Sequence, residues 1–147
     1  MGRSKENNEL DPFVKYGVFK KAFTNVNLFK SQKNFLAAHV LIFSILEDRV
    51  TAAYVVCYRA LNQRNPPQYN ELSKIAFRNL VSNLTVMGVL DELLAEKIRN
   101  AAIKRNKLTH EMMWRLDCFS EEDVNEVRYL INKVNKMRRY FVKIHKK

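Results

Sequence analysis

The six residues from Arg105 to His110, Arg-Asn-Lys-Leu-Thr-His, carry the chemically most active side chains of the sequence. An arginine presents a fork of donors that matches phosphate oxygens and the charge that grows on phosphorus during transfer. A histidine can move a proton to or from a hydroxyl or a leaving oxygen near neutral pH. Asn106, beside the arginine, can position either group. This set of side chains predicts cleavage of a phosphodiester bond without a metal ion.

The spacing of these residues limits what one chain can do. Arg105 and His110 are separated by five residues, which on a helix is about 140° of rotation and about 7.5 Å of rise. The two side chains therefore do not stack, whereas Asn106 and His110 share a helix face. Arg105 is in line with Ala101 and Leu108, on a stripe that we expect to be covered, where a guanidinium needs a partner. A symmetric dimer would pair two such sets in a single cleft.

Long helices with short connections are predicted to position this segment. The chain of 147 residues is 47% apolar and contains only three Gly and three Pro. Apolar residues recur at three- and four-residue steps, the pattern of one helix face. We therefore expect an all-α fold, an antiparallel bundle of about five helices. The expected helices cover roughly residues 12–30, 31–62, 71–87, 92–113 and 121–144.

Polar residues and one glycine mark the expected ends of these helices. Ser31, Asn70 and Asp91 are each predicted to cap a helix N-terminus. Ser120 to Asp123 resembles a capping box for the last helix. Gly88 is the predicted stop of the helix over 71–87.

The chain is expected to form a single helical domain over residues 12–147, preceded by a disordered N-terminus, residues 1–11. That N-terminus is polar and lacks an apolar signal core. The longest nearly unbroken apolar run, Phe35 to Leu46, is shorter than the 18 or so residues that a membrane span needs. We therefore expect a cytoplasmic protein that does not enter a membrane, with Cys57 and Cys118 reduced.

A formal net charge of +11 predicts attraction to polyanions, among which RNA, DNA, an anionic membrane and an acidic protein all qualify. The sequence shows no helix-turn-helix spacing, and charge does not separate RNA from DNA. The basic C-terminal stretch is either an RNA-binding stripe or a solvated helix end that complements the helix dipole. The candidate nucleic-acid-binding residues are Lys104, Lys107, Lys136, Arg138, Arg139 and Lys143.

The pattern R-N-x3-H, formed by Arg105, Asn106 and His110 on the last-but-one helix, resembles the HEPN superfamily. The resemblance covers about residues 31 to 144 in helix order. It implies a dimeric helical domain with Arg105, Asn106 and His110 as the catalytic set of a metal-independent endoribonuclease. Many such proteins are toxins or defence components, so RNA and an antitoxin or nucleotidyltransferase partner are further expectations.

Members of this superfamily also place a polar or acidic residue on an earlier long helix, facing the motif. Glu47, Asp48 and Arg49 interrupt the apolar second helix suitably, and the sequence does not choose among them; Glu47 and Asp48 are taken as supporting candidates. One toxin subgroup carries a tyrosine, modified by the partner nucleotidyltransferase, two residues after the histidine. This chain has Met112 there, which argues against that regulation.

A second resemblance competes with the first. The stretch from Phe77 to His110 is also similar to the mannitol operon repressor-like proteins, which share the helical layout and a related R-x4-H pattern. Those proteins are regulators rather than nucleases. The alternative function is therefore a non-catalytic helical module for regulation or interaction, in which the same residues hold a contact between helices or copies.

His39 lies on the apolar face of the second helix and is interpreted as a hydrogen-bonded core residue rather than a ligand. It would form a metal pair with His110 only if the fold brought the two together, and acidic partners are not evident in the sequence. We expect neither a metal nor another cofactor.

Overall fold

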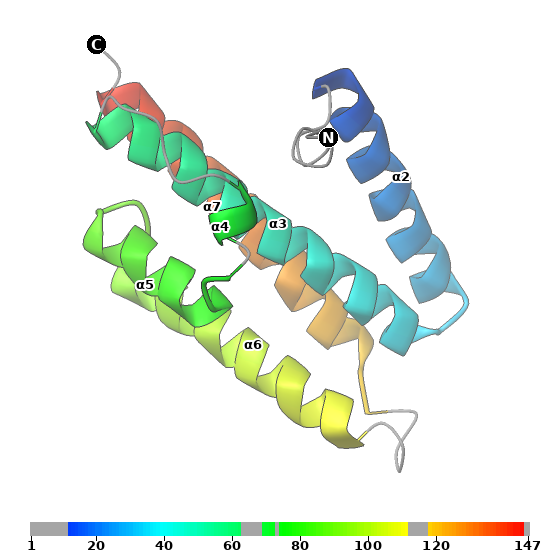
Figure 1. Cartoon of the computed structure of the whole chain (residues 1–147). Coiled ribbons are helices and arrows are strands. Elements are labelled where there is room, and N and C mark those ends of the chain that lie inside the picture. The colour runs from blue at the N-terminus through cyan, green and yellow to red at the C-terminus, as the bar shows by residue number, and fades with distance from the viewer. Residues whose placement is uncertain (1–11, 63–68, 73, 112–117, 146–147) are drawn as a thin grey trace, which may run out of the picture.

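The computed structural model describes residues 12–62, 69–72, 74–111 and 118–145, and all regular elements of these ranges are helices (Figure 1). The predicted disorder of residues 1–11 lies outside them. Five helices have ten or more residues and α4 is a single turn. They are α2 (Pro12–Ser31), α3 (Phe35–Asn62), α4 (Tyr69–Leu72), α5 (Phe77–Val86), α6 (Glu92–Glu111) and α7 (Glu121–His145).

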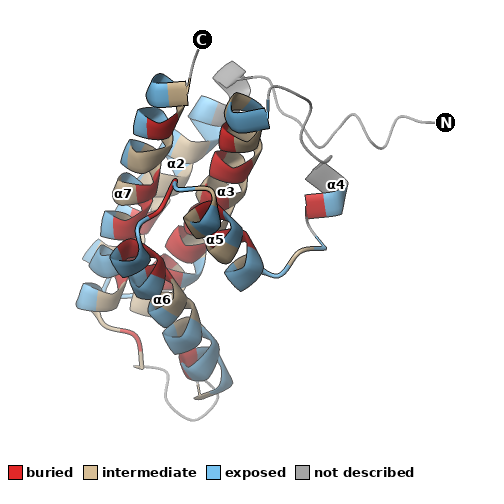
Figure 2. Ribbon diagram, turned by 90° about the vertical axis from the view of Figure 1, so that its left-hand side faces the viewer, coloured by how far each residue is buried: buried red, intermediate tan, exposed pale blue. Residues whose placement is uncertain are grey.

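Helix α3 is the centre of the bundle. It packs most extensively against α7, and also against α2 and α5, while α6 packs against α5 and α7. The buried residues form inward-facing stripes along these helices (Figure 2). The all-α bundle expected from the apolar periodicity is therefore confirmed. Within the described part of the chain, every helix falls short of the length and apolarity that crossing a bilayer requires.

The directions of the helices refine the expected antiparallel arrangement. Neighbours in sequence such as α2 and α3, or α6 and α7, run in opposite directions, but α3 and α7 run parallel (Figure 1). Contacts along the pair agree with this: His39, early in α3, packs against Phe119, two residues before the start of α7. The chain runs back along α6 before it enters α7, and α7 therefore points in the same direction as α3.

Capping residues mark the starts of α6 and α7, and a glycine marks the end of α5. The Leu94 N–H donates to Asp91 Oδ1 (2.7 Å), and Ser120 and Asp123 exchange the reciprocal bonds of a capping box, so both predicted caps are confirmed. Gly88 follows α5 with φ +89°, which confirms the predicted stop, because glycine adopts this left-handed conformation without strain.

Two predicted helix starts are wrong. Ser31 ends α2, where its hydroxyl donates to the Leu28 carbonyl, and Asn34 caps α3 by accepting from the Ala37 N–H (3.2 Å). The turn between them requires Lys33 at φ 60°. Asn70, the other predicted cap, lies inside α4.

The single helix predicted over 71–87 is instead divided into α4 and α5. The Lys74 and Ile75 N–H groups bond three residues back, to Glu71 and Leu72, and Ala76 is extended (ψ 143°). An extended residue cannot continue the helix, although Leu72 and Ile75 still pack against the core.

Both cysteines are free, as expected. Cys57 is fully buried in α3, and burial raises the pKa of its thiol to about 11, against a smaller opposing effect of Arg138. Because the thiolate is the reactive form, Cys57 acts as a packing residue at neutral pH.

Candidate functional site around Arg105

The motif segment occupies the C-terminal end of α6. Leu108 is buried, and its carbonyl accepts a weak bond from Cys118 Sγ (3.6 Å). Asn106 and His110 are exposed on the other side, with Thr109 donating back to the Arg105 carbonyl. Of the stripe predicted to be covered, Leu108 is buried and Ala101 and Arg105 are half-buried.

Arg105 is half-buried and held from three directions. Its guanidinium carbon lies 4.2 Å from the centre of the Phe43 ring, Nη2 is 3.6 Å from Glu47 Oε2, and Nε donates to Asn106 Oδ1 (2.9 Å). A stacked, paired guanidinium meets the need for a partner that its position on the covered stripe predicted. These three contacts leave Nη1 without a hydrogen bond to any of the described residues.

The structure chooses between the two supporting acids. Glu47 is on the side of α3 that faces α6 and contacts Arg105 directly. Asp48 is one residue further, about 100° around the helix, and pairs with the neighbouring Arg49 (2.9 Å). Arg49 in turn stacks on Phe19 of α2 (4.6 Å). Glu47 therefore belongs to the Arg105 site, whereas Asp48 belongs to the contact between α3 and α2.

Phe43 was not singled out in the sequence, where it is one of many apolar residues of the second helix. The only signal for it in the sequence is its four-residue spacing from His39 and from Glu47. His39, Phe43 and Glu47 follow each other at four-residue steps, so they form one stripe of α3. Phe43 is fully buried, and its ring has the Arg105 guanidinium on one side and the His39 ring 6.0 Å away.

His110 is exposed at the open end of α6. It shares the Asn106 face, as the four-residue spacing predicts, and makes no hydrogen bond or ion pair with the residues that the structure describes. The structure thus joins Arg105, Asn106 and Glu47 within one chain and leaves His110 open to solvent.

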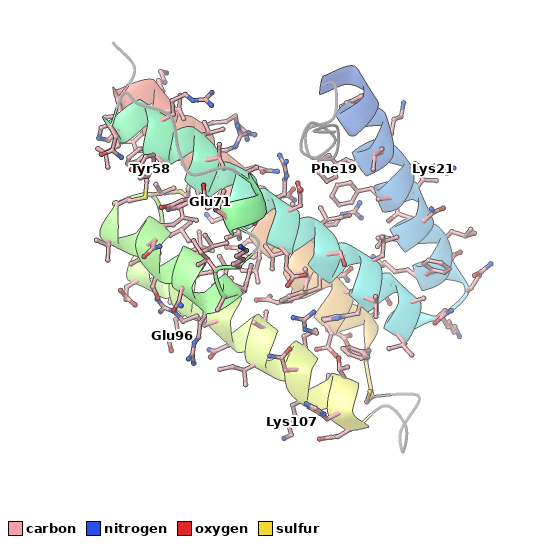
Figure 3. The ribbon with its side chains drawn as sticks, viewed as in Figure 1. Phe19, Lys21, Tyr58, Glu71, Glu96 and Lys107 are labelled. Carbon is pink, nitrogen blue, oxygen red and sulfur yellow. The ribbon has the colours of Figure 1, made fainter. Side chains whose placement is uncertain are left out.

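The candidate nucleic-acid-binding residues fall into two separate groups. Lys104 and Lys107 are on α6 near Arg105; Lys104 pairs with Asp123, whereas Lys107 projects outward (Figure 3). The others lie on α7, between about 20 and 30 Å along the helix from Asp123. They are Lys136, Arg139 and Lys143, all exposed, and the half-buried Arg138.

Arg138 is the unusual member of the second group. Its Nε is buried without a hydrogen-bond partner. Burial lowers the pKa of Arg138, and the like charges of Arg49 and Arg139 lower it further, while Cys57 opposes them. The lysines of α6 near Arg105 and the basic residues of α7 are two separate basic regions rather than one continuous stripe.

His39 is a core residue, as predicted, with only 3% of its surface exposed. Its ring packs against Phe119 (4.4 Å between centres). The expected hydrogen bonding is wrong in part, because Nδ1 is buried without a partner. Burial lowers the pKa of His39 from 6.5 to about 4; Asp123 opposes this shift, and Arg105 and Lys104 reinforce it.

This shift predicts a pH dependence of stability. Between about pH 6.5 and pH 4, His39 binds a proton in the unfolded chain but not in the folded chain. The free energy of unfolding therefore falls as the pH decreases through this window. Denaturant unfolding at pH 7 and pH 5 measures the effect. His39→Leu, which cannot titrate, is expected to show a smaller loss; an equal loss in both proteins would contradict the assignment.

Comparison of the chain with family models, with curated proteins and with solved structures gave no match. The described residues contain no group of three His, Cys, Asp or Glu side chains placed to hold a metal ion. The site consists of an oriented guanidinium, a side-chain amide hydrogen-bonded to it and a solvent-exposed imidazole at the same end of α6.

Proposed function

We propose that the protein is a metal-independent endoribonuclease of the HEPN type that acts as a homodimer. The observation that carries the proposal is the contrast at the end of α6, where Arg105 is held by Phe43, Glu47 and Asn106 while His110 is open to solvent. A preorganised cation and an accessible proton carrier, brought together from two copies of the chain, are the pair that phosphodiester cleavage needs. The resemblance of R-N-x3-H to the HEPN motif supports the same conclusion.

In the proposed reaction, a ribose 2′-hydroxyl loses its proton and its oxygen bonds to the adjacent phosphorus. The bond from phosphorus to the 5′-oxygen breaks, and that oxygen gains a proton. His110 carries the proton in one of these transfers, and the Nη1 donors of Arg105 hold the phosphate oxygens as charge grows on them. The products are a 2′,3′-cyclic phosphate and a 5′-hydroxyl, and the step consumes no further reactant.

Dimerisation is part of the proposal because of the geometry of α6. Arg105 is turned toward α3, whereas His110 is about 140° further around the helix. A second copy related by a two-fold axis would bring its own His110 toward the first copy's Arg105. We further propose a cytoplasmic toxin or defence protein, with an antitoxin or nucleotidyltransferase as partner.

A second candidate function is a non-catalytic regulatory module like the mannitol operon repressor-like proteins. The observation in its favour is that Phe43 and Glu47 both bind Arg105 within one chain, so the arginine also fastens α6 to α3. In that case replacement of His110 would change dimerisation or stability and no RNA would be cut.

Cleavage of a labelled RNA oligonucleotide by the purified full chain in excess EDTA tests the proposal. We expect cleavage with cyclic phosphate ends, and no cleavage of the DNA oligonucleotide of the same sequence, because DNA lacks the attacking hydroxyl. Intact RNA after prolonged incubation, or cleavage that EDTA abolishes, would contradict the proposal.

A further inference from the structure

A pocket of about 220 Å³ lies next to the Arg105 site, between α3, α6 and α7. Its buried and half-buried lining is formed by His39, Ala101, Asp123 and Val127. Exposed polar side chains surround this lining: Asn100, Lys104, Glu126 and Lys97, whose ammonium lies 5.6 Å from the Tyr129 ring centre. A small concavity with an apolar base and a few polar groups is the usual form of a ligand site. A volume of this size suits a ligand no larger than one nucleobase.

The aromatic wall of the pocket carries no charge at neutral pH. His39 is held against Phe119, and its buried Nδ1 has no acceptor for a second proton. The ring therefore stays neutral, in agreement with its lowered pKa. With 3% of its surface exposed and its ring packed against Phe119, His39 gives the pocket an uncharged lining rather than an open ring face for stacking.

The polar groups of the pocket differ in availability. Lys104 and Asp123 bind each other, and Ser120 also donates to Asp123 (3.0 Å). Asn100 and Glu126 are exposed, and the side chain of neither makes a hydrogen bond to any residue in the described part of the chain. They offer one amide, which donates and accepts, and one carboxylate, which only accepts.

These free groups select among nucleobases. A carboxylate accepts well from an exocyclic amino group, and an asparagine amide pairs with adjacent donor and acceptor atoms of a base edge. Adenine, cytosine and guanine carry an amino group, whereas uracil presents carbonyl oxygens in its place. Glu126 would therefore favour the first three and disfavour uracil.

The pocket also has the right neighbour for a nucleotide of a chain. Phe43 contacts both His39 and Arg105, with the His39 ring centre 6.0 Å from the Phe43 ring centre and the Arg105 guanidinium carbon 4.2 Å from it. Lys104, at the pocket, directly precedes Arg105 in α6. A base in the pocket would leave its phosphate close to these two cations.

We infer that this pocket binds one amino-bearing base of the RNA, next to the phosphate that Arg105 holds. The inference rests on the proposed function for the identity of the substrate. It gives the enzyme a preference for cleavage beside adenine, cytosine or guanine over uracil.

Binding to the full-length His110→Ala chain tests the pocket without cleavage. The probes are AMP, CMP, GMP, UMP and ribose 5-phosphate, titrated with calorimetric or NMR detection. We expect UMP and ribose 5-phosphate to bind about tenfold more weakly than the best of the other three, and Asn100→Ala and Glu126→Gln each to weaken that one about tenfold. Glu96→Gln, on the outer side of α6, is the matched control (Figure 3). Equal binding of all probes, or unchanged binding in both variants, would overturn the inference.

Two further experiments distinguish a free nucleotide from an RNA chain as the source of the base, and the pocket inference from the proposed function. A trinucleotide of the preferred base should bind more tightly than its mononucleotide, because Arg105 and Lys104 add phosphate contacts; equal affinity would overturn the assignment to an RNA chain. If wild-type protein cuts RNA without base preference, the pocket inference fails while the proposed function stands. If the bases bind selectively but no RNA is cut, the proposed function alone fails.

Discussion

Replacement of His110 with alanine is expected to slow RNA cleavage by about 100- to 10,000-fold, the usual contribution of a general acid or base. The fold should be unaffected, because His110 is exposed and bonds to none of the described residues. An exposed side chain of this kind contributes at most about 0.5 kcal/mol to stability. Initial cleavage rates, with thermal unfolding of the same preparations, measure both quantities.

His145→Ala is the matched control for this variant. His145 is a histidine near the end of α7, where its Nδ1 lies 3.0 Å from the Phe141 carbonyl, far along the bundle from the motif. The His145→Ala protein should cleave RNA at the wild-type rate. Wild-type cleavage by the His110 variant, or an equal loss in both variants, would contradict a catalytic role for His110.

Replacement of Arg105 with lysine is expected to lower cleavage by about 100-fold or more, the effect of losing one donor group aimed at a transition-state charge. Lysine keeps the charge but loses the planar fork, which lies on Phe43 and bonds to Asn106 while it turns toward Glu47. A flexible ammonium cannot hold all three contacts and a phosphate at once. Single-turnover rates at saturating protein isolate this loss from weaker RNA binding.

Arg99→Lys provides the comparison within the same helix. The Arg99 side chain is 31% exposed, against 30% for Arg105, and it pairs with Glu92 (3.2 Å) on a different part of α6. It should cleave normally. If Arg105→Lys also cleaved normally, positive charge alone would be sufficient, and the orientation of Arg105 by α3 would have no catalytic meaning.

The helices themselves were largely predictable from local patterns. The start and end of α2, the Asp91 cap of α6 and the capping box of α7 all depend on residues close in sequence. The error at the start of α3 arose where two local signals compete. Ser31 and Asn34 are both good caps, and only the left-handed turn at Lys33 decides between them.

The arrangement around Arg105 was predictable only in part. The covered position of Arg105 followed from helical spacing, and so did its need for a partner. The choice of Glu47 over Asp48 required the packing angle between α3 and α6, which no local pattern contains. The same holds for Phe43, which is an ordinary apolar residue until Arg105 is laid on it.

The neutral His39 is another feature that sequence could not supply. Its apolar surroundings predicted burial, but not the unpaired Nδ1 or the pocket beside it. Both depend on where Phe119 and Asp123 enter from the loop before α7 and from its first turn. Long-range contacts of this kind define the site, whereas the helices only bring its residues within reach.

Mixing two inactive variants tests most directly the central claim, that Arg105 of one copy acts with His110 of another. Arg105→Lys and His110→Ala chains carrying different tags are combined under conditions that exchange subunits, and mixed dimers are verified by tandem capture. In a mixed dimer, an intact Arg105 from one chain meets an intact His110 from the other. We expect cleavage in EDTA about tenfold or more above either variant alone. A mixture with verified mixed dimers but only the average rate of its components would contradict the shared site.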